Sequence, residues 1–108
     1  MLSDRKNLAE SGVVTFTIEE DVRMRAISGH IFIDSRGFVH AHEMMKIHKE
    51  IIKSVRMLYE QTIEENPVID RGSLVQILRR EIGKLCFVLT GRTPIIMPII
   101  IEKNISNF

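Results

Sequence analysis

The chain has 108 residues, enough for one domain that buries about two-thirds of the surface its unfolded form exposes, without disulfides or metal. Lysine and arginine together number 15 and aspartate and glutamate 14, so bulk charge excludes attraction to nucleic acid or membranes without a local patch. The single cysteine, Cys86, excludes an intramolecular disulfide and is typical of a reducing cytosol. With no signal peptide after Met1 and no apolar run long enough to span a bilayer, we expect a soluble, cytoplasmic protein.

Two alternating runs in the first third of the chain predict a β-hairpin. In VVTFTIEE, residues 13–20, the side chains of Val14, Phe16 and Ile18 share one face, which is typical of a half-buried strand. The run AISGHIFID, residues 26–34, alternates in the same way. The short charged link between the two runs suits an antiparallel pairing.

The next run has the period of an amphipathic helix. Apolar residues recur every three or four positions from residue 43 to residue 65, and Asn66-Pro67 ends the pattern. The predicted buried stripe is Met44, Ile47, Ile51, Val55 and Leu58.

A second helix is predicted from a capping box at its start and a glycine at its end. Ser73 is placed to cap the amide of Gln76, and Gly91 suits a left-handed C-terminal cap. Cys86 lies beside the apolar stripe, where a thiol is buried and unreactive. The stripe itself is Leu74, Leu78, Ile82, Leu85 and Leu89.

The last run, TPIIMPIIIE, predicts a strand that is apolar on both faces. Two helices cover only one side of a small sheet, and exposing several isoleucines costs on the order of 1.5–3 kcal/mol each. We therefore expect the second face to meet another domain or another copy of the chain. Pro98 has no N–H, so the strand is expected at an edge or with a bulge. The candidate interface residues are Phe87, Ile96, Met97, Ile99 and Ile101.

The predicted order is strand, strand, helix, helix, strand. The simplest way to bury all the stripes is an α+β fold in two layers, with both helices packed on one face of a three-stranded sheet. Residues 13–103 form this single domain. Residues 1–12 are predicted to be a flexible linker ahead of it, and residues 104–108 a tail.

The histidines do not predict a metal site. His40 and His42 open a fragment that is similar to the His-x-His-x-Asp-His metal motif, but Met44 and Met45 occupy the positions of its aspartate and last histidine. His48 points about 120° away from His42 on the helix surface. We predict no metal and no catalytic residue in the chain. A small metalloenzyme remains the least favoured alternative.

A basic stripe offers a second functional hypothesis. Lys46, Lys49, Lys53 and Arg56 follow helical spacing on the face opposite the apolar one, as expected for contacts with RNA phosphates. The alternative, an ordinary solvated face paired with Glu50 and Glu60, is the interpretation we prefer.

The segment Ser35-Arg36-Gly37-Phe38 predicts a sharp corner after the second strand. Gly37 permits a left-handed turn, and Phe38 returns to the core. Arg36 is expected to pair with a carboxylate, either Glu81, which the helical spacing places in the apolar arc, or one on a partner domain.

At this point the chain resembles the C-terminal domain of bacterial ribonuclease J. The resemblance is carried by LAESGVVTFTIEE, IDSRGFV and LTGRTPIIMPIIIE, and it extends from about Leu8 to Glu102. Its most specific parts are Ser35 to Phe38 and, after the two helices, Thr90 to Pro94.

The resemblance implies an RNA-degrading parent enzyme. Ribonuclease J enzymes are zinc-dependent 5′-to-3′ exonucleases and endonucleases (hydrolases) with a metallo-β-lactamase fold, and their metal ligands lie upstream of this domain. Zinc is thus expected in the absent catalytic domain and no cofactor in this one. The resemblance also implies partners: the protein's own catalytic domain, further copies of the chain, and RNA through the parent enzyme. We therefore expect a non-catalytic accessory or oligomerisation domain, with a stand-alone RNA-binding module as the alternative.

Overall fold

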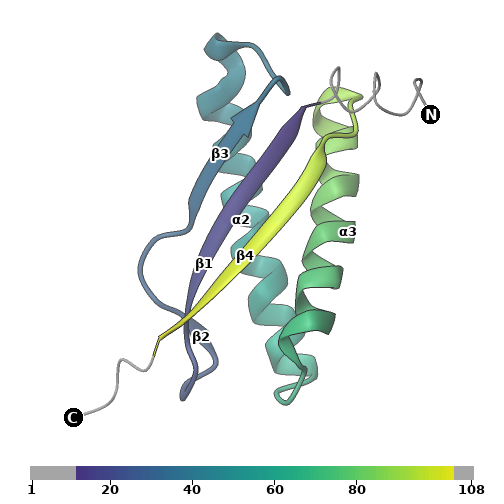
Figure 1. The fold of residues 1–108 in the computed structure, drawn as a ribbon. Coiled ribbons are helices and arrows are strands. Elements are labelled where there is room, and N and C mark those ends of the chain that lie inside the picture. Colours follow the sequence, from purple (N-terminus) through teal and green to yellow (C-terminus); the bar gives the residue numbers. More distant parts are fainter. Residues whose placement is uncertain (1–11, 104–108) are drawn as a thin grey trace.

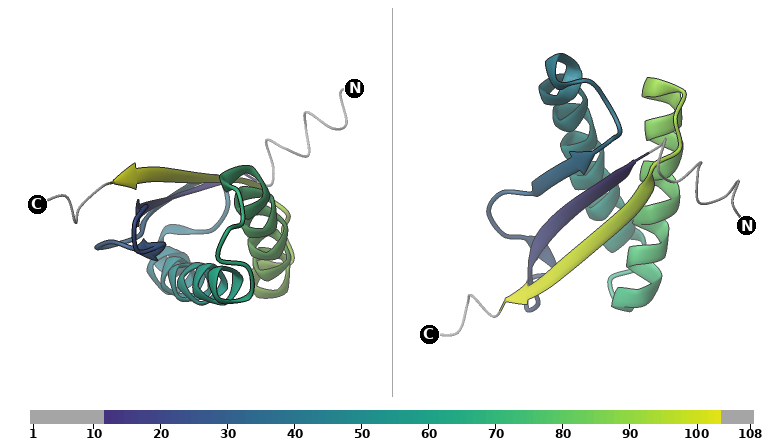
Figure 2. Two further views of the ribbon diagram at one scale, coloured as in Figure 1. Left: turned by 90° about the horizontal axis from the view of Figure 1, so that it is seen from below. Right: turned by 45° about the horizontal axis from the view of Figure 1, so that its top comes forward.

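The computed structural model describes residues 12–103 as two helices packed on one face of a sheet (Figures 1 and 2). The predicted two-layer α+β fold is therefore confirmed, but the sheet has four strands where three were predicted. The elements are β1 (Val13–Asp21), β2 (Ala26–Ile27), β3 (Phe32–Arg36), α2 (Ala41–Glu65), α3 (Arg71–Thr90) and β4 (Ile95–Lys103).

The sheet is built around β1. β2 and β3 both pair with β1 in antiparallel orientation, and β4 pairs with it in parallel orientation. Within residues 12–103, β4 pairs only with β1, so the predicted edge position of this strand is confirmed. Pro98 lies opposite Phe16 in this parallel pairing.

We predicted one continuous strand over residues 26–34, but the structure divides this run into β2 and β3. The chain leaves the sheet between β2 and β3, where Gly29 has a φ of 74° and Ser28 donates its N–H to the carbonyl of Glu19. A positive φ is accessible to glycine without a steric penalty, which explains the break. Ile31 and Ile33 nevertheless face the core, as the alternation predicted.

The core lies between the sheet and the helices. Val14, Phe16 and Ile18 are fully buried against the apolar stripes of α2 and α3. Ile96 is only 6% exposed and belongs to this core, so it is removed from the candidate interface. The buried residues of the helices are Ile47, Ile51, Val55, Tyr59 and Thr62 in α2, and Leu74, Leu78, Ile82 and Cys86 in α3.

The ends of α3 show one prediction wrong and one confirmed. The N-cap is Asp70 and not Ser73. The Asp70 carboxylate accepts hydrogen bonds from the Ser73 backbone N–H at 3.0 Å and from the Ser73 hydroxyl at 2.8 Å. At the other end, Gly91 adopts the left-handed conformation with φ 74°, as predicted. Among the described residues, neither helix is long and apolar enough to cross a membrane.

Candidate functional site

The corner after β3 is held by a close backbone contact. Gly37 has a φ of 67°, and Phe38 is 1% exposed, so both predictions for this segment are confirmed. Gly12 packs so tightly here that a Cβ at this position would lie 2.3 Å from the Arg36 carbonyl oxygen and 2.5 Å from the Gly37 carbonyl carbon. Gly12 also accepts the N–H of Ile95 at 2.9 Å. Gly12 is therefore held by contacts within the domain, whereas the rest of the predicted linker, residues 1–11, and the predicted tail, residues 104–108, lie outside the described residues.

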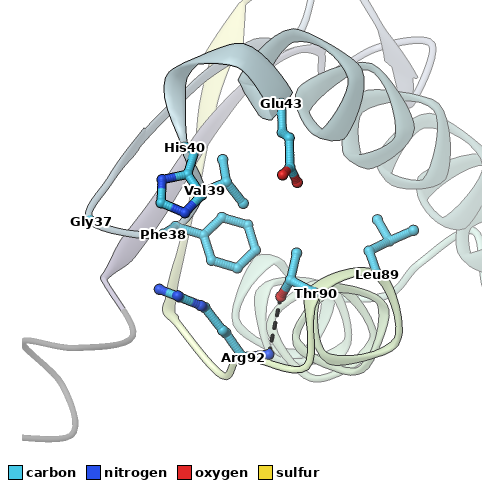
Figure 3. Close-up of a pocket in the computed structure, with 8 residues that line it drawn as sticks. All are labelled: Gly37, Phe38, Val39, His40, Glu43, Leu89, Thr90 and Arg92. Atoms are coloured by element: carbon cyan, nitrogen blue, oxygen red, sulfur yellow. Dashed lines mark hydrogen bonds between the residues drawn. The ribbon is translucent and has the colours of Figure 1, made fainter.

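This corner forms one wall of a pocket, and the end of α3 forms the other (Figure 3). The two segments that carry the family resemblance, residues 35–38 and 90–94, thus meet across one cavity of about 450 Å³. We call it the corner pocket. Its lining residues are Gly37, Phe38, Val39, His40, Glu43, Leu89, Thr90 and Arg92.

The corner pocket combines an apolar centre with opposite charges on two sides. Leu89 supplies apolar surface beside the buried Phe38 ring, Glu43 reaches in from the first turn of α2, and Arg92 extends from beyond α3 (Figure 3). Thr90 fixes the Arg92 backbone, because its Oγ1 accepts the Arg92 N–H at 3.0 Å and donates to the Cys86 carbonyl at 2.7 Å. Among residues 12–103, the Arg92 guanidinium makes no ion pair.

The histidines near the pocket do not assemble a metal centre. The rings of His40 and His42 stack with centroids 5.8 Å apart, and His42 Nε2 lies 3.5 Å from a Glu43 oxygen. Within residues 12–103, no three histidine, cysteine, aspartate or glutamate side chains are grouped so that they could hold an ion. The described residues therefore do not fit zinc.

His48 forms a pair with Ser35 that has a structural explanation. Ser35 Oγ lies 2.8 Å from His48 Nε2, a distance that would suit a nucleophile and its base. Ser35 is only 6% exposed, however, which leaves no room for a substrate. Burial lowers the pKa of His48, and the nearby Asp34 opposes that shift. The pair joins β3 to α2 inside the domain.

The basic stripe is accessible on the outside of α2. Lys46, Lys49 and Lys53 are exposed, while Arg56 is partly buried and donates from Nη2 to the Gly29 carbonyl at 3.5 Å. The ion pairs with Glu50 and Glu60 that we expected are absent among the described residues. The positive side chains of the stripe are therefore not in contact with carboxylates among the described residues.

A third surface lies on the side of the sheet that faces away from the helices, toward the viewer in Figure 1. We call it the outer sheet face. Ile95, Met97, Ile99 and Ile101 of β4 are 37–48% exposed there, and Phe32 of β3 is 58% exposed. Alternate residues of a strand are about 6.6 Å apart, so the β4 row is about 20 Å long.

Phe87 is 55% exposed, as the sequence predicted, but it does not lie on the outer sheet face. It follows Gly83 by one helical turn, and a Cβ at Gly83 would lie 3.8 Å from Ile96. Phe87 therefore sits on the flank of α3 that is turned toward β4.

The predicted pairing of Arg36 with Glu81 is wrong. Arg36 lies 3.9 Å from Asp34 on its own strand and is highly exposed, so it does not reach Glu81. Glu81 is bound instead by Arg80 at 3.1 Å and Lys84 at 3.4 Å on its own helix. Hydrogen bonding to Arg80 and the charge of Lys84 hold the pKa of Glu81 below its usual range.

The sequence reasoning missed a buried polar cluster at the opposite end of the domain. Glu20 is 4% exposed, and its Oε2 accepts from the Tyr59 hydroxyl at 2.5 Å and from Arg25 Nε at 3.2 Å. Arg25 Nη1 also donates to the carbonyls of Pro67 at 3.3 Å and Ile69 at 3.0 Å. The alternation of β1 contained the signal, since position 20 falls on the same face as Val14, Phe16 and Ile18.

The comparisons with known proteins agree with the resemblance in the sequence. The family described as Ribonuclease J C-terminal domain matches residues 1–103. The chain is 36% identical over 102 residues to Ribonuclease J 2 of Staphylococcus epidermidis and 35% identical over 102 residues to Ribonuclease J 2 of Staphylococcus aureus. Each match covers 94% of this chain but only 18% of the length of the relative. The chain therefore belongs to the ribonuclease J C-terminal domain family.

Proposed function

We propose that this chain is a non-catalytic accessory domain that joins copies of a ribonuclease-J-like protein through its outer sheet face. The observation that carries the proposal is the row of four exposed apolar side chains on β4, with Phe32 beside it. The family supports the link to a ribonuclease. In this proposal the parent protein is cytoplasmic, and its RNA hydrolysis and zinc belong to a domain outside this chain.

The charges around the outer sheet face favour a second copy as the partner. Arg36 and Asp34 lie at one end of the face, and Lys103 pairs with Glu19 at 3.0 Å at the other end. A two-fold axis that lies between two stacked sheets, parallel to them and perpendicular to the strands, would place each end of the face opposite the other end of the partner's face. The end that carries Arg36 and Asp34 would then lie opposite the end that carries Glu19 and Lys103, so that each end brings both a cation and an anion to the interface.

The free edge of β4 is a poorer place for association. The N–H of Ile95 donates to Gly12 in the direction of β1, and in a parallel pair alternate residues face the same neighbour. The N–H of position 98 would therefore face the free edge, but Pro98 has none. A missing donor in the middle of an edge strand opposes pairing with another strand, so the proposal uses the face of the sheet and not its edge.

Light scattering after size-exclusion chromatography tests this proposal. We expect a mass above the 12.5 kDa of one chain, and a return to that mass for Ile99→Lys, which places a charge in the middle of the apolar row. Val68→Lys is the matched control, because Val68 is 86% exposed in the turn between α2 and α3. If the Ile99→Lys variant has the same high mass as the Val68→Lys variant, the proposal is contradicted.

The unpaired basic stripe supports RNA binding as a second candidate function. Three exposed lysines and Arg56 extend over about 15 Å of helix, at 1.5 Å per residue, and make no ion pair among the described residues. Contacts of three or four residues with single-stranded RNA phosphates would give a slope of about −2 to −3 for log affinity against log salt.

A titration with a single-stranded RNA at several salt concentrations tests the second candidate. Lys49→Glu combined with Lys53→Glu should abolish binding, whereas Lys84→Glu on α3 should leave it unchanged. If the unmodified chain binds RNA negligibly at low salt, or if its affinity does not vary with salt, this role for the stripe is excluded.

A further inference from the structure

The first half of α2 carries a groove that belongs neither to the corner pocket nor to the outer sheet face. Its volume is about 570 Å³, and we call it the methionine groove. Met45, His48 and Ile52 recur at steps of three and four, so they form one stripe along the helix. Ala41 and Met44 complete the apolar part of its lining.

The inner part of the methionine groove is held in place by the domain, whereas its rim is exposed. Ile52 packs against the hydrophobic core, and His48 Nε2 lies 2.8 Å from Ser35 Oγ of β3. Met45, by contrast, is 83% exposed. Methionine side chains are unbranched and polarisable, so they adapt to the shape of an apolar partner. The groove is therefore an apolar surface that nothing within residues 12–103 covers.

The charge beside the methionine groove is positive. Lys49 lines the groove, and Lys46 and Lys53 lie about one turn before and after it. All three lysines are exposed, and none makes an ion pair among the described residues. No carboxylate of residues 12–103 lines the groove. An occupant that is complementary to it carries an apolar group with negative charge beside it.

The chemistry of the lining favours a peptide over a nucleobase as the apolar group. Proteins hold single-stranded bases mainly by stacking them on aromatic rings. The rings in this groove are those of two histidines: His48 is bonded to Ser35, and His42 is stacked on His40 with ring centroids 5.8 Å apart. The rest of the apolar lining is thioether and aliphatic, which is typical of surfaces that bind the apolar side chains of peptides.

We propose that the methionine groove binds an acidic peptide segment of a partner protein. A bulky apolar side chain of the segment packs between Met44, Met45 and Ile52, and its flanking carboxylates pair with Lys49 and Lys53. The proposal does not rest on the outer sheet face, because α2 belongs to the helix layer, which lies behind the sheet in Figure 1. A peptide bound in this way competes with RNA for the basic stripe, since Lys49 and Lys53 belong to both surfaces.

A synthetic peptide with a phenylalanine and a leucine between two pairs of aspartates tests the proposal. Its affinity for the full chain is measured by fluorescence anisotropy at low salt. Met45→Glu should lower the affinity by about tenfold or more, because it places a carboxylate in the apolar contact. Met57→Glu is the matched control on the same helix: Met57 is 53% exposed and does not line the groove, so the affinity should stay unchanged. Equal affinities of the two variants would overturn the proposal.

Two control peptides separate the apolar contact from the charge. Replacing the aspartates with lysines, or the phenylalanine and leucine with serines, should each abolish binding. Methyl NMR of the methionines then locates the site, because the Met44 and Met45 signals should shift with the acidic peptide while the Met57 signal does not. No binding at millimolar peptide, shifts confined to other methionines, or Met44 and Met45 shifts produced by single-stranded RNA and not by the peptide would each overturn the proposal.

Discussion

The buried cluster around Glu20 gives the sharpest prediction about stability. Arg25→Met keeps much of the apolar stem but removes the guanidinium that binds Glu20 and two carbonyls in the turn between α2 and α3. Removing one partner of a buried ion pair costs about 3–5 kcal/mol, because the other charge remains buried. Tyr59 still donates to Glu20, and the Arg25 side chain is 26% exposed, so we expect the lower end, about 3 kcal/mol.

Urea unfolding followed by circular dichroism measures this loss. With a denaturant slope of about 1.5 kcal/mol/M, the midpoint should fall by about 2 M. Arg79→Met is the matched control, because Arg79 is exposed and makes no ion pair among the described residues. Adding Glu20→Gln to Arg25→Met should recover more than half of the loss, since the uncompensated charge is then gone. A single variant as stable as the control, or no recovery in the double variant, would refute the reasoning.

Three further predictions concern the corner, the thiol and the buried tyrosine. Gly12→Ala should cost more than about 2 kcal/mol in urea unfolding because of its backbone contact, whereas Gly91→Ala, at a similar φ but in open space, should cost about 1 kcal/mol; equal losses would contradict the contact. Burial raises the pKa of Cys86 to about 11, so iodoacetamide at pH 8 should modify the thiol only in urea, and rapid modification of the folded chain would show that the site is open. Burial, and then the hydrogen bond to Glu20, raises the pKa of Tyr59 above the ordinary value of about 10. The folded state thus holds the proton more tightly, so this stabilisation is intact below pH 10 and is lost as the pH rises further. Tyr59→Phe should weaken the alkaline decrease in the urea midpoint, and an unchanged decrease would be inconsistent with this explanation.

The fold was predictable where a single period governed a long segment. The apolar spacing of α2 and α3 identified both helices, and the alternation of β1 identified its buried face. Local alternatives limited the rest. The run 26–34 alternates throughout, but one positive φ at Gly29 divides it into two strands. The cap of α3 moved to Asp70 because a carboxylate three residues earlier competes with the Ser73 hydroxyl for the same role.

The sites were predictable only in part, because they depend on contacts between distant segments. The sequence singled out residues 35–38 and 90–94 as specific, but nothing in their local pattern shows that they face each other across one pocket. Arg36 was expected to reach Glu81, whereas each found partners on its own element. Arg25, in a solvent-facing turn, gave no sign of the two loop carbonyls that it binds.

Sedimentation equilibrium of the unmodified chain over a wide range of concentrations tests the central claim most directly. If the outer sheet face joins two copies, the average mass should rise above 12.5 kDa as the concentration increases, and the rise should persist at high salt because the contact is mainly apolar. A mass that stays at 12.5 kDa up to millimolar concentration, with the chain still soluble, would contradict the account.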